Sequence, residues 1–193
     1  MDLTRTVAPT LTSIDVALVK AGKRIRHGTE DDLIAFWIRA ADEYVEKRTN
    51  LALMQQTFVL RLRRILPSVQ LPRPPLKSIT SVKYAVTGGT EQVLSDPDDR
   101  VRIDRMLPTI DTGLVEQAGT MEIEYVVGAD DPEKVPAALR QASYLLAAHY
   151  VSAREAGYFE PRIMQVAKKI EFGVDSLVKE LRVPNGTDLN GGW

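Results

Sequence analysis

Residues 70–84 read QLPRPPLKSITSVKY, and this stretch places a stiff segment directly in front of a strand-like one. Pro72, Pro74 and Pro75 fix the backbone angle φ and bias the residue before each of them toward extended geometry. From Ile79 onward, apolar and polar residues alternate with the period of a β-strand, although imperfectly. Because proline donates no backbone hydrogen bond, the stretch predicts a strand at the edge of a sheet.

Other segments on either side of this stretch also read as strands. In residues 56–65, QTFVLRLRRI, an apolar set alternates with a set that contains Arg61 and Arg63. Residues 119–128, GTMEIEYVVG, alternate apolar with acidic side chains. The glycines of TGGT, residues 87–90, suit a tight hairpin that leads into EQVL. DPDDRVRIDR, residues 96–105, supplies a turn and a further short strand. We therefore expect a small antiparallel sheet.

Helical patterns flank the expected sheet. Residues 11–21 read as a short helix capped by Ser13, with its apolar face formed by Ile14, Ala17 and Leu18. A long amphipathic helix is expected from the cap Thr29 to a stop at Asn50. A second long helix is expected after Pro136, and a third behind Pro161.

This order of elements predicts an α+β fold that is mainly α. We expect a helical bundle in one domain, residues 1–182, with a small antiparallel β-sheet inserted at about residues 55–128 between helix pairs. The last stretch, PNGTDLNGGW, contains several helix- and strand-breaking residues and predicts a flexible, extended tail over residues 183–193.

Composition limits the classes of function. The chain has 193 residues, which suits one domain, and its 44% hydrophobic content is that of a globular protein. It contains no cysteine, so disulfides and thiolate metal sites are excluded. No segment resembles a signal peptide or approaches the ~20 apolar residues that cross a bilayer. The net charge of −1 gives no field for gripping a nucleic acid backbone.

The sequence offers little that reads as an active site. His27 lies in a loop beside glycine and is interpreted as solvated, and His149 lies on an apolar helix, where a hydrogen-bonded structural imidazole is the favoured reading. Neither histidine has a nucleophile or carboxylate at a recognised catalytic spacing. We predict no enzyme activity and no cofactor.

Two charged stretches have both a functional and a structural interpretation. Asp96, Asp98 and Asp99 resemble the start of a calcium loop, but the later glycine and glutamate of such loops are missing, so a turn whose Asp side chains bond to nearby backbone is favoured. The arginines of RLRRIL, residues 61–66, are able to contact phosphate. Because acids elsewhere balance them, a solvated or subunit-pairing face is favoured.

The prolines and the tail are better candidates for interaction. The proline segment, residues 72–75, either protects a sheet edge or offers a preformed surface on which a neighbouring copy docks. At the other end of the chain, Trp193 is either a disordered terminus or, together with Leu189, an anchor for a partner.

The order of these motifs resembles the head-tail connector, or adaptor, proteins of tailed phages, prophages and gene transfer agents. The resemblance rests on four segments that follow one another at similar separations and span most of residues 29–156. They are the helix end AADEYVEKRTNLALMQQTFVLRL, the segment LPRPPLKSITSVKY, the strand MEIEYVVG and the helix VPAALRQASYLLAAHYVSAREA.

This resemblance implies a structural virion protein rather than an enzyme. Such subunits form a ring, typically dodecameric, that connects the portal protein of the head to a stopper or tail-completion protein. DNA passes through the channel of the ring without specific binding, and no membrane is involved. The implied location is the neck of a phage or phage-like particle, after synthesis in the host cytoplasm.

The resemblance also suggests interaction sites in this chain. In a ring, the stiff proline segment of one copy meets the flank of the next, so we expect the subunit interface to include Arg73, Pro74 and Pro75. In similar connectors the C-terminal helix and tail reach the portal. The corresponding candidates in this chain are Leu181, Val183, Pro184, Leu189 and Trp193.

Three alternatives remain open. A tail-terminator or other neck ring protein would share the lack of catalytic residues, but it should be mostly β. A small hydrolase or metal-dependent enzyme would use His149 with Asp98 or Asp99. A helical regulator that binds DNA would need a basic face, which the charge balance disfavours.

Overall fold

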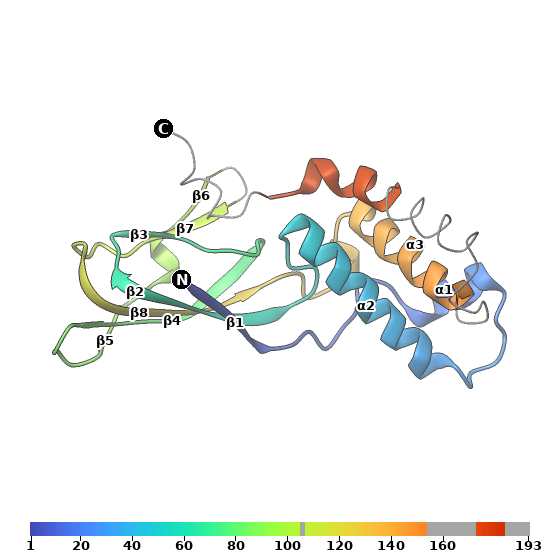
Figure 1. Ribbon diagram of the computed structural model, residues 1–193, viewed down its shortest axis with the longest axis horizontal. Coiled ribbons are helices and arrows are strands. Elements are labelled where there is room, and N and C mark those ends of the chain that lie inside the picture. The colour runs from blue at the N-terminus through green and yellow to red at the C-terminus, as the bar shows by residue number, and fades with distance from the viewer. Residues whose placement is uncertain (105–106, 154–172, 184–193) are drawn as a thin grey trace. The chain divides into compact units, whose positions relative to one another are not determined.

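A computed structural model describes residues 1–104, 107–153 and 173–183. The chain divides into two compact units, each built from separated segments (Figure 1). The first unit comprises Met1–Thr10, Asn50–Asp130 and Val183–Trp193, and the second comprises Leu11–Thr49 and Asp131–Arg182.

The first unit contains a five-stranded antiparallel sheet. Its strand order is β1-β2-β8-β4-β5, so the N-terminal strand lies at one edge and a two-residue strand at the other. Leu60, Ile123 and Val82 face one another in register across the three central strands and are fully buried. The strands are β1 (Asp2–Val7), β2 (Gln56–Ile65), β4 (Leu76–Val86), β5 (Gln92–Val93) and β8 (Gln117–Val127).

A second, three-stranded sheet completes the first unit. It has the order β3-β7-β6, and a short 3₁₀ helix, η1 (Asp98–Arg100), leads into β6. Val69 and Ile110 of this sheet belong to the same buried apolar cluster as the inner face of the five-stranded sheet, so the two sheets share one core. The strands are β3 (Ser68–Gln70), β6 (Val101–Asp104) and β7 (Leu107–Asp111).

The second unit is helical in its described residues. Its long helices, α2 (Asp31–Thr49) and α3 (Ala137–Ala153), carry the predicted apolar stripes, with Ile34, Ile38 and Ala41 of α2 fully buried. Shorter helical elements are α1 (Val16–Lys23), η2 (Pro132–Lys134), residues 173–178 and η3 (Lys179–Leu181). Within the described part of the chain, no helix combines the length and apolarity that a membrane span requires.

The predicted fold class, α+β but mainly α, is wrong in its emphasis. Helix accounts for about 37% of the structure and strand for about 33%, in two sheets rather than one small sheet. The error came from strands that carry little pattern. β3 is three residues long, and β1 pairs at a sheet edge with five of its six residues exposed, so it shows no apolar alternation.

Several local predictions are confirmed and others need correction. The strand at 56–65, the hairpin at TGGT and the helix after Pro136 are present, and Asn50 ends α2 with a positive φ of 58°. The first helix begins at Val16 rather than at residue 11, because Asp15 caps it by accepting a hydrogen bond from the Ala17 N–H. The predicted apolar face is also wrong there, because Leu18 is 51% exposed. Most of the helix expected behind Pro161 lies outside the described residues.

Candidate functional site: surfaces and buried clusters

The proline segment is anchored within its own unit. The Pro72 carbonyl accepts a hydrogen bond from the Tyr125 hydroxyl at 3.1 Å. The carbonyls of Pro74 and Pro75 accept from the backbone N–H groups of Ala52 and Gly128, each at 2.9 Å. These bonds hold the segment against the end of the five-stranded sheet, so it is not a projecting arm.

The three predicted interface residues differ in how far they are exposed. Pro74 is buried, Arg73 is half-buried and Pro75 is exposed. Arg73 has a positive φ of 64°, a conformation that favours glycine, and its charge acts on the buried Tyr125. Burial raises the pKa of the Tyr125 hydroxyl, and the guanidinium opposes that rise. Of the three predicted interface residues, Arg73 and Pro75 are therefore the two that another molecule can reach.

The outer face of the five-stranded sheet carries a row of alternating charges. Asp2, Arg61, Glu122 and Lys83 face one another in register across four neighbouring strands. Arg61 pairs with Glu122 at 2.7 Å, and Lys83 pairs with Glu91 at 4.0 Å. Opposite charges on neighbouring strands stabilise a sheet and cancel one another at longer range.

The basic strand predicted at residues 61–64 is thus largely neutralised by the strand beside it. Besides the Arg61 pair, Arg64 pairs with Glu116 at 2.8 Å. The register shifts between Leu62 and Arg64, so Arg63 occupies a β-bulge and is exposed. The acids that balance the arginines lie in or beside β8, which favours the solvated or subunit-pairing reading over a phosphate site.

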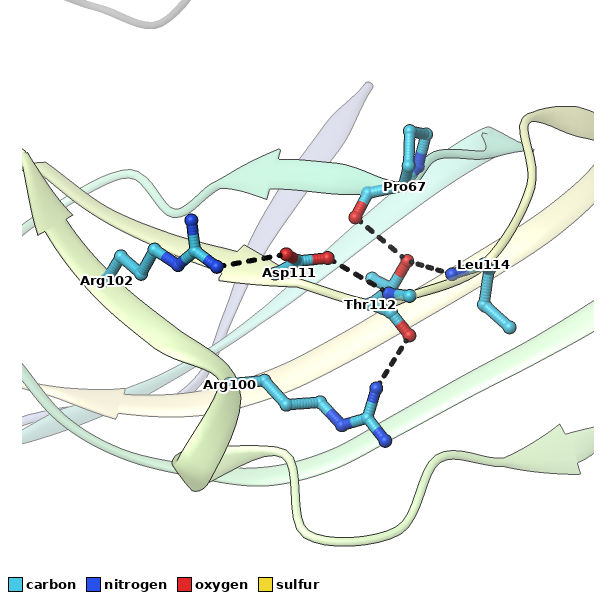
Figure 2. Close-up of polar contacts among 7 residues, drawn as sticks. Pro67, Arg100, Arg102, Asp111, Thr112 and Leu114 are labelled. Atoms are coloured by element: carbon cyan, nitrogen blue, oxygen red, sulfur yellow. Dashed lines mark hydrogen bonds and ion pairs between the residues drawn. The ribbon is translucent and has the colours of Figure 1, made fainter.

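Thr112 is the centre of a buried hydrogen-bond cluster in the first unit, shown in Figure 2. Its side-chain oxygen donates to the Leu66 carbonyl at 2.7 Å and accepts from the Leu114 N–H at 3.2 Å. The Thr112 backbone N–H donates to the Pro67 carbonyl at 2.9 Å, and its carbonyl accepts from Arg100 Nη1 at 3.1 Å. This one residue, only 1% exposed, ties the loop after β7 to the turn between β2 and β3.

Neighbouring contacts fix the rest of the loop between β7 and β8. The Asp111 carboxylate accepts from the Gly113 N–H at 3.1 Å and pairs with Arg102 at 3.6 Å (Figure 2). Gly113 has a φ of 67°, which suits a residue without a side chain. Leu114 packs on the core, whereas Val115 is 79% exposed. The loop is therefore built to hold a defined shape.

The acidic turn protects a sheet edge. Asp98 accepts a hydrogen bond from the Ile79 N–H of β4 at 2.6 Å, on the side of β4 that β5 leaves open. The turn interpretation is correct in assigning the carboxylate to backbone, although the bonded N–H lies 19 residues away rather than within the turn. Within the described residues, no group of three or more His, Asp or Glu side chains is placed to hold a metal ion.

The two histidines show no catalytic arrangement. His27 is exposed and its Nδ1 lies 2.9 Å from the Thr29 hydroxyl. His149 is half-buried on α3 and its ring lies 6.1 Å from that of Tyr150. Asp98, one of the carboxylates that the hydrolase alternative would use, already accepts a hydrogen bond from the Ile79 N–H.

Asp42 forms a buried polar cluster in the second unit. Its carboxylate accepts hydrogen bonds from the backbone N–H of Ser13 at 2.9 Å and from the Ser13 hydroxyl at 2.5 Å. Burial raises the pKa of the Asp42 carboxyl, while these bonds and the nearby Ser143 hydroxyl lower it in part. Ser143 lies out of hydrogen-bond geometry, and among the described residues its hydroxyl is the buried side-chain group that has no partner. Ser13 thus bonds to α2 instead of capping α1.

The predicted portal-contact residues are only partly described. Leu181 is half-buried in η3. Val183 is 2% exposed, and its carbonyl accepts a hydrogen bond from Asn50 Nδ2 at 2.8 Å, which gives it a packing role in the first unit. Pro184, Leu189 and Trp193 lie outside the described residues.

In comparisons with solved structures, the whole chain is similar to chains from phage-like particles and their necks. No protein-family model and no curated protein matches the chain. Among solved structures, it is similar to a chain from the neck of an empty gene transfer agent (GTA) particle with C6 symmetry, at 26% identity and a TM-score of 0.75. It is also similar to a chain of the virion of a native GTA particle, at 26% identity and a TM-score of 0.74. A chain from the neck of a native GTA particle with C12 symmetry has 25% identity and a TM-score of 0.71. Each comparison covers 100% of this chain and 99% of the other.

These comparisons confirm the resemblance that the motif order suggested. The chain has the fold of a phage-like neck protein of the gene transfer agent type over its full length, and the predicted location in such a particle is confirmed with it.

Proposed function

We propose that this chain is a ring-forming adaptor in the neck of a gene transfer agent or similar phage-like particle, where it joins the head to the tail around a channel for DNA. The observation that carries the proposal is the full-length similarity to neck chains in particles with C6 and C12 symmetry. A twelvefold ring of this chain agrees with both symmetries, because C6 is a subgroup of C12.

The electrostatics of the first unit suit a channel protein that does not hold DNA. Most basic residues of β2 are paired with acids on or beside β8, and the whole chain has a net charge of −1. A surface without excess positive charge releases few counterions from DNA and therefore binds it weakly. This property would allow a duplex to slide past the subunit.

The ring contact is proposed to include the proline segment. Arg73 and Pro75 are accessible on a segment whose carbonyl groups are already bonded, and the buried Pro74 fixes its shape. A preformed segment loses little conformational freedom on docking. The portal partner is proposed to contact Leu181 and the tail residues Pro184, Leu189 and Trp193, while Val183 anchors the start of the tail. A stopper or tail-completion protein is the proposed partner on the tail side.

The location and role are tested by deleting the gene in the producing strain and supplying the chain again with an epitope tag. We expect the deletion to yield DNA-filled heads without tails, and the tagged protein to be labelled by antibody at the junction of head and tail. Normal tailed particles from the deletion strain, or label only along the tail, would reject the adaptor role. Label along the tail would instead favour a tail-side ring protein.

The proposed interface is tested with Arg73→Glu and Pro75→Ala together. Arg26→Glu, in an exposed loop of the second unit, is the matched charge control. We expect the double variant to remain folded but to enter particles at a reduced level, while the control enters normally. For the tail, removal of residues 184–193 should leave a folded chain that no longer joins heads to tails. Unchanged joining by either variant would count against the contact that it tests.

A further inference from the structure

The outer strands of the two sheets in the first unit have edges that no described strand covers. Two of these edges are long enough to pair with another strand. They are the outer edge of β1 in the five-stranded sheet and the outer edge of β6 in the three-stranded sheet. The remaining edges are less suitable. β3 and β5 have only three and two residues, and Asp98 blocks the edge of β4 at Ile79.

The register shows which backbone groups point out of β6. The Leu71 N–H donates to the Pro108 carbonyl at 2.8 Å, so the carbonyl of Pro108 faces the β3 side. Ile103 is the residue opposite Pro108 in the β6–β7 pair. Because antiparallel pairs alternate between bonded and non-bonded, this pair exchanges no hydrogen bonds. The N–H and C=O of Ile103 therefore point to the open side, and its side chain is 76% exposed.

The same alternation identifies the outward groups of β1. The Leu94 N–H donates to the Val82 carbonyl at 2.8 Å, so Val82 faces β5 and the next residue, Lys83, faces β8. Lys83, Glu122, Arg61 and Asp2 lie in register across four strands, and bonded and non-bonded pairs alternate along this row. The backbone groups of Glu122 therefore face β4, those of Arg61 face β1, and those of Asp2 face β2. The N–H and C=O of Leu3 therefore point to the open side of β1.

The two open edges lie on opposite sides of the first unit. β3 follows β2 after two residues and starts on the β2 side, whereas β6 starts beside β4, where Asp98 of η1 bonds to Ile79. The order β3-β7-β6 thus runs in the same sense as β2-β8-β4, with β1 beyond β2. A head-to-tail ring needs two different surfaces on opposite flanks of each copy, and these edges meet that condition.

Both edges lack two of the strongest devices that keep free edges apart, although β1 has a bulge between Arg5 and Val7, beyond its first four residues. β1 and β6 contain no proline and no lysine, and β1 is rich in residues that favour strands. The exposed Arg102 of β6 and the exposed Asp2 of β1 have opposite charges. The backbone N–H and C=O groups of such an edge are available for pairing with a strand of another chain.

We propose that the outer edge of β1 in one copy pairs with the outer edge of β6 in the next copy, so that the sheets of neighbouring subunits become continuous around the ring. The inference rests on the proposed ring and adds these two strand edges to the contact that is proposed for the proline segment. Each contact adds main-chain hydrogen bonds through Leu3 and Ile103, which is strand addition between copies of one chain.

Disulfide cross-linking tests the contact directly, because the natural chain has no cysteine. Thr4→Cys is combined with either Arg102→Cys or Ile103→Cys, since side chains at 102 and 103 point to opposite faces of β6 and one pair must share a face with Thr4. Oxidation of assembled particles, repeated with a short bismaleimide to allow for a register offset, should produce a ladder from dimer to the full ring. Thr4→Cys with Val93→Cys on β5 is the matched control pair and should give no ladder.

The outcomes separate this inference from the proposed function. Particles with a labelled neck but with no ladder, or with dimers only, would overturn the strand pairing and leave the adaptor role standing. Absence of the chain from the neck would overturn the adaptor role itself.

A second variant pair separates backbone from side-chain effects. Ile103→Pro removes an N–H that points outward and breaks no bond to β7, so the subunit should remain folded. We expect its incorporation into particles to fall about tenfold or more, because the lost bond recurs at every contact. Ile103→Thr keeps the N–H and should enter particles within about threefold of the natural chain. Normal incorporation of a folded Ile103→Pro variant, or an equal loss with Ile103→Thr, would overturn the strand pairing.

Discussion

Thr112 in the first unit and Asp42 in the second are both buried polar residues that hold a loop in place, but they do so with different chemistry. Thr112 is neutral, and its side chain bonds to the backbone of the adjoining turns. Asp42 carries a carboxyl whose pKa is raised by burial, and it lies beside the Ser143 hydroxyl, which has no partner among the described residues.

The comparison indicates which of the two units should respond to pH. A satisfied neutral cluster fixes geometry without responding to pH, which suits the loop between β7 and β8. A buried carboxyl that anchors a segment through hydrogen bonds makes that segment depend on the protonation state of the carboxyl. The segment before α1 is held to α2 by that carboxyl, so we expect the second unit to be the pH-sensitive one.

The largest effect is expected from Asp42→Ala. The change leaves the Ser13 N–H and hydroxyl without their acceptor in a buried site, which should lower the free energy of unfolding by about 3 kcal/mol. Asp32→Ala, an exposed position on the same helix, should stay within about 0.5 kcal/mol. Urea denaturation followed by circular dichroism measures both. Equal small losses in the two variants would show that the Asp42 bonds contribute little.

Thr112→Val is the corresponding change in the first unit and is expected to cost less. Valine keeps the shape of threonine but strands the Leu66 carbonyl and the Leu114 N–H, for a loss of about 2 kcal/mol. Thr120→Val, on an exposed strand position, should be nearly neutral. Hydrogen exchange should show faster exchange in the loop after β7 for Thr112→Val alone. A loop that exchanges as slowly as in the natural chain would mean that other contacts hold it.

Both clusters also mark the limit of what the sequence predicted. The long helices, the β2 and β8 strands and the glycine hairpin follow from periodicity, because each buries one face of a regular element. Thr112 and Asp42 belong to no periodic pattern. A polar residue at a core position of a helix is a weak signal: Asp42 follows Ala41 on the buried stripe, and its partner Ser13 lies 29 residues away.

The wrong emphasis of the predicted fold class is explained by strands that show little sequence pattern. β1 gains its place by pairing with β2, more than fifty residues away, and such pairing leaves no local pattern at an exposed edge. The prolines predict a stiff segment from the sequence alone, but the anchoring of this segment depends on Tyr125, Ala52 and Gly128, which only the folded chain brings to it. The resemblance to neck proteins rests on the order of motifs along the sequence, and the periodicity of single helices and strands does not indicate it.

The smallest effect expected is a difference in pH dependence between the natural chain and Asp42→Asn. Burial raises the folded-state pKa of Asp42 above its unfolded value of 3.8, so the folded state binds more protons between the two pKa values. The contribution of this group to stability is therefore fully present below pH 3.8 and is lost as pH rises through the folded-state pKa. Asparagine stays neutral, so the stability of the natural chain relative to Asp42→Asn should fall across that window. Thr112→Val, in the first unit, should leave this window unchanged. Denaturation curves measured at intervals from pH 3.5 upward test this, and parallel profiles for the natural chain and Asp42→Asn would contradict a pH-sensitive second unit.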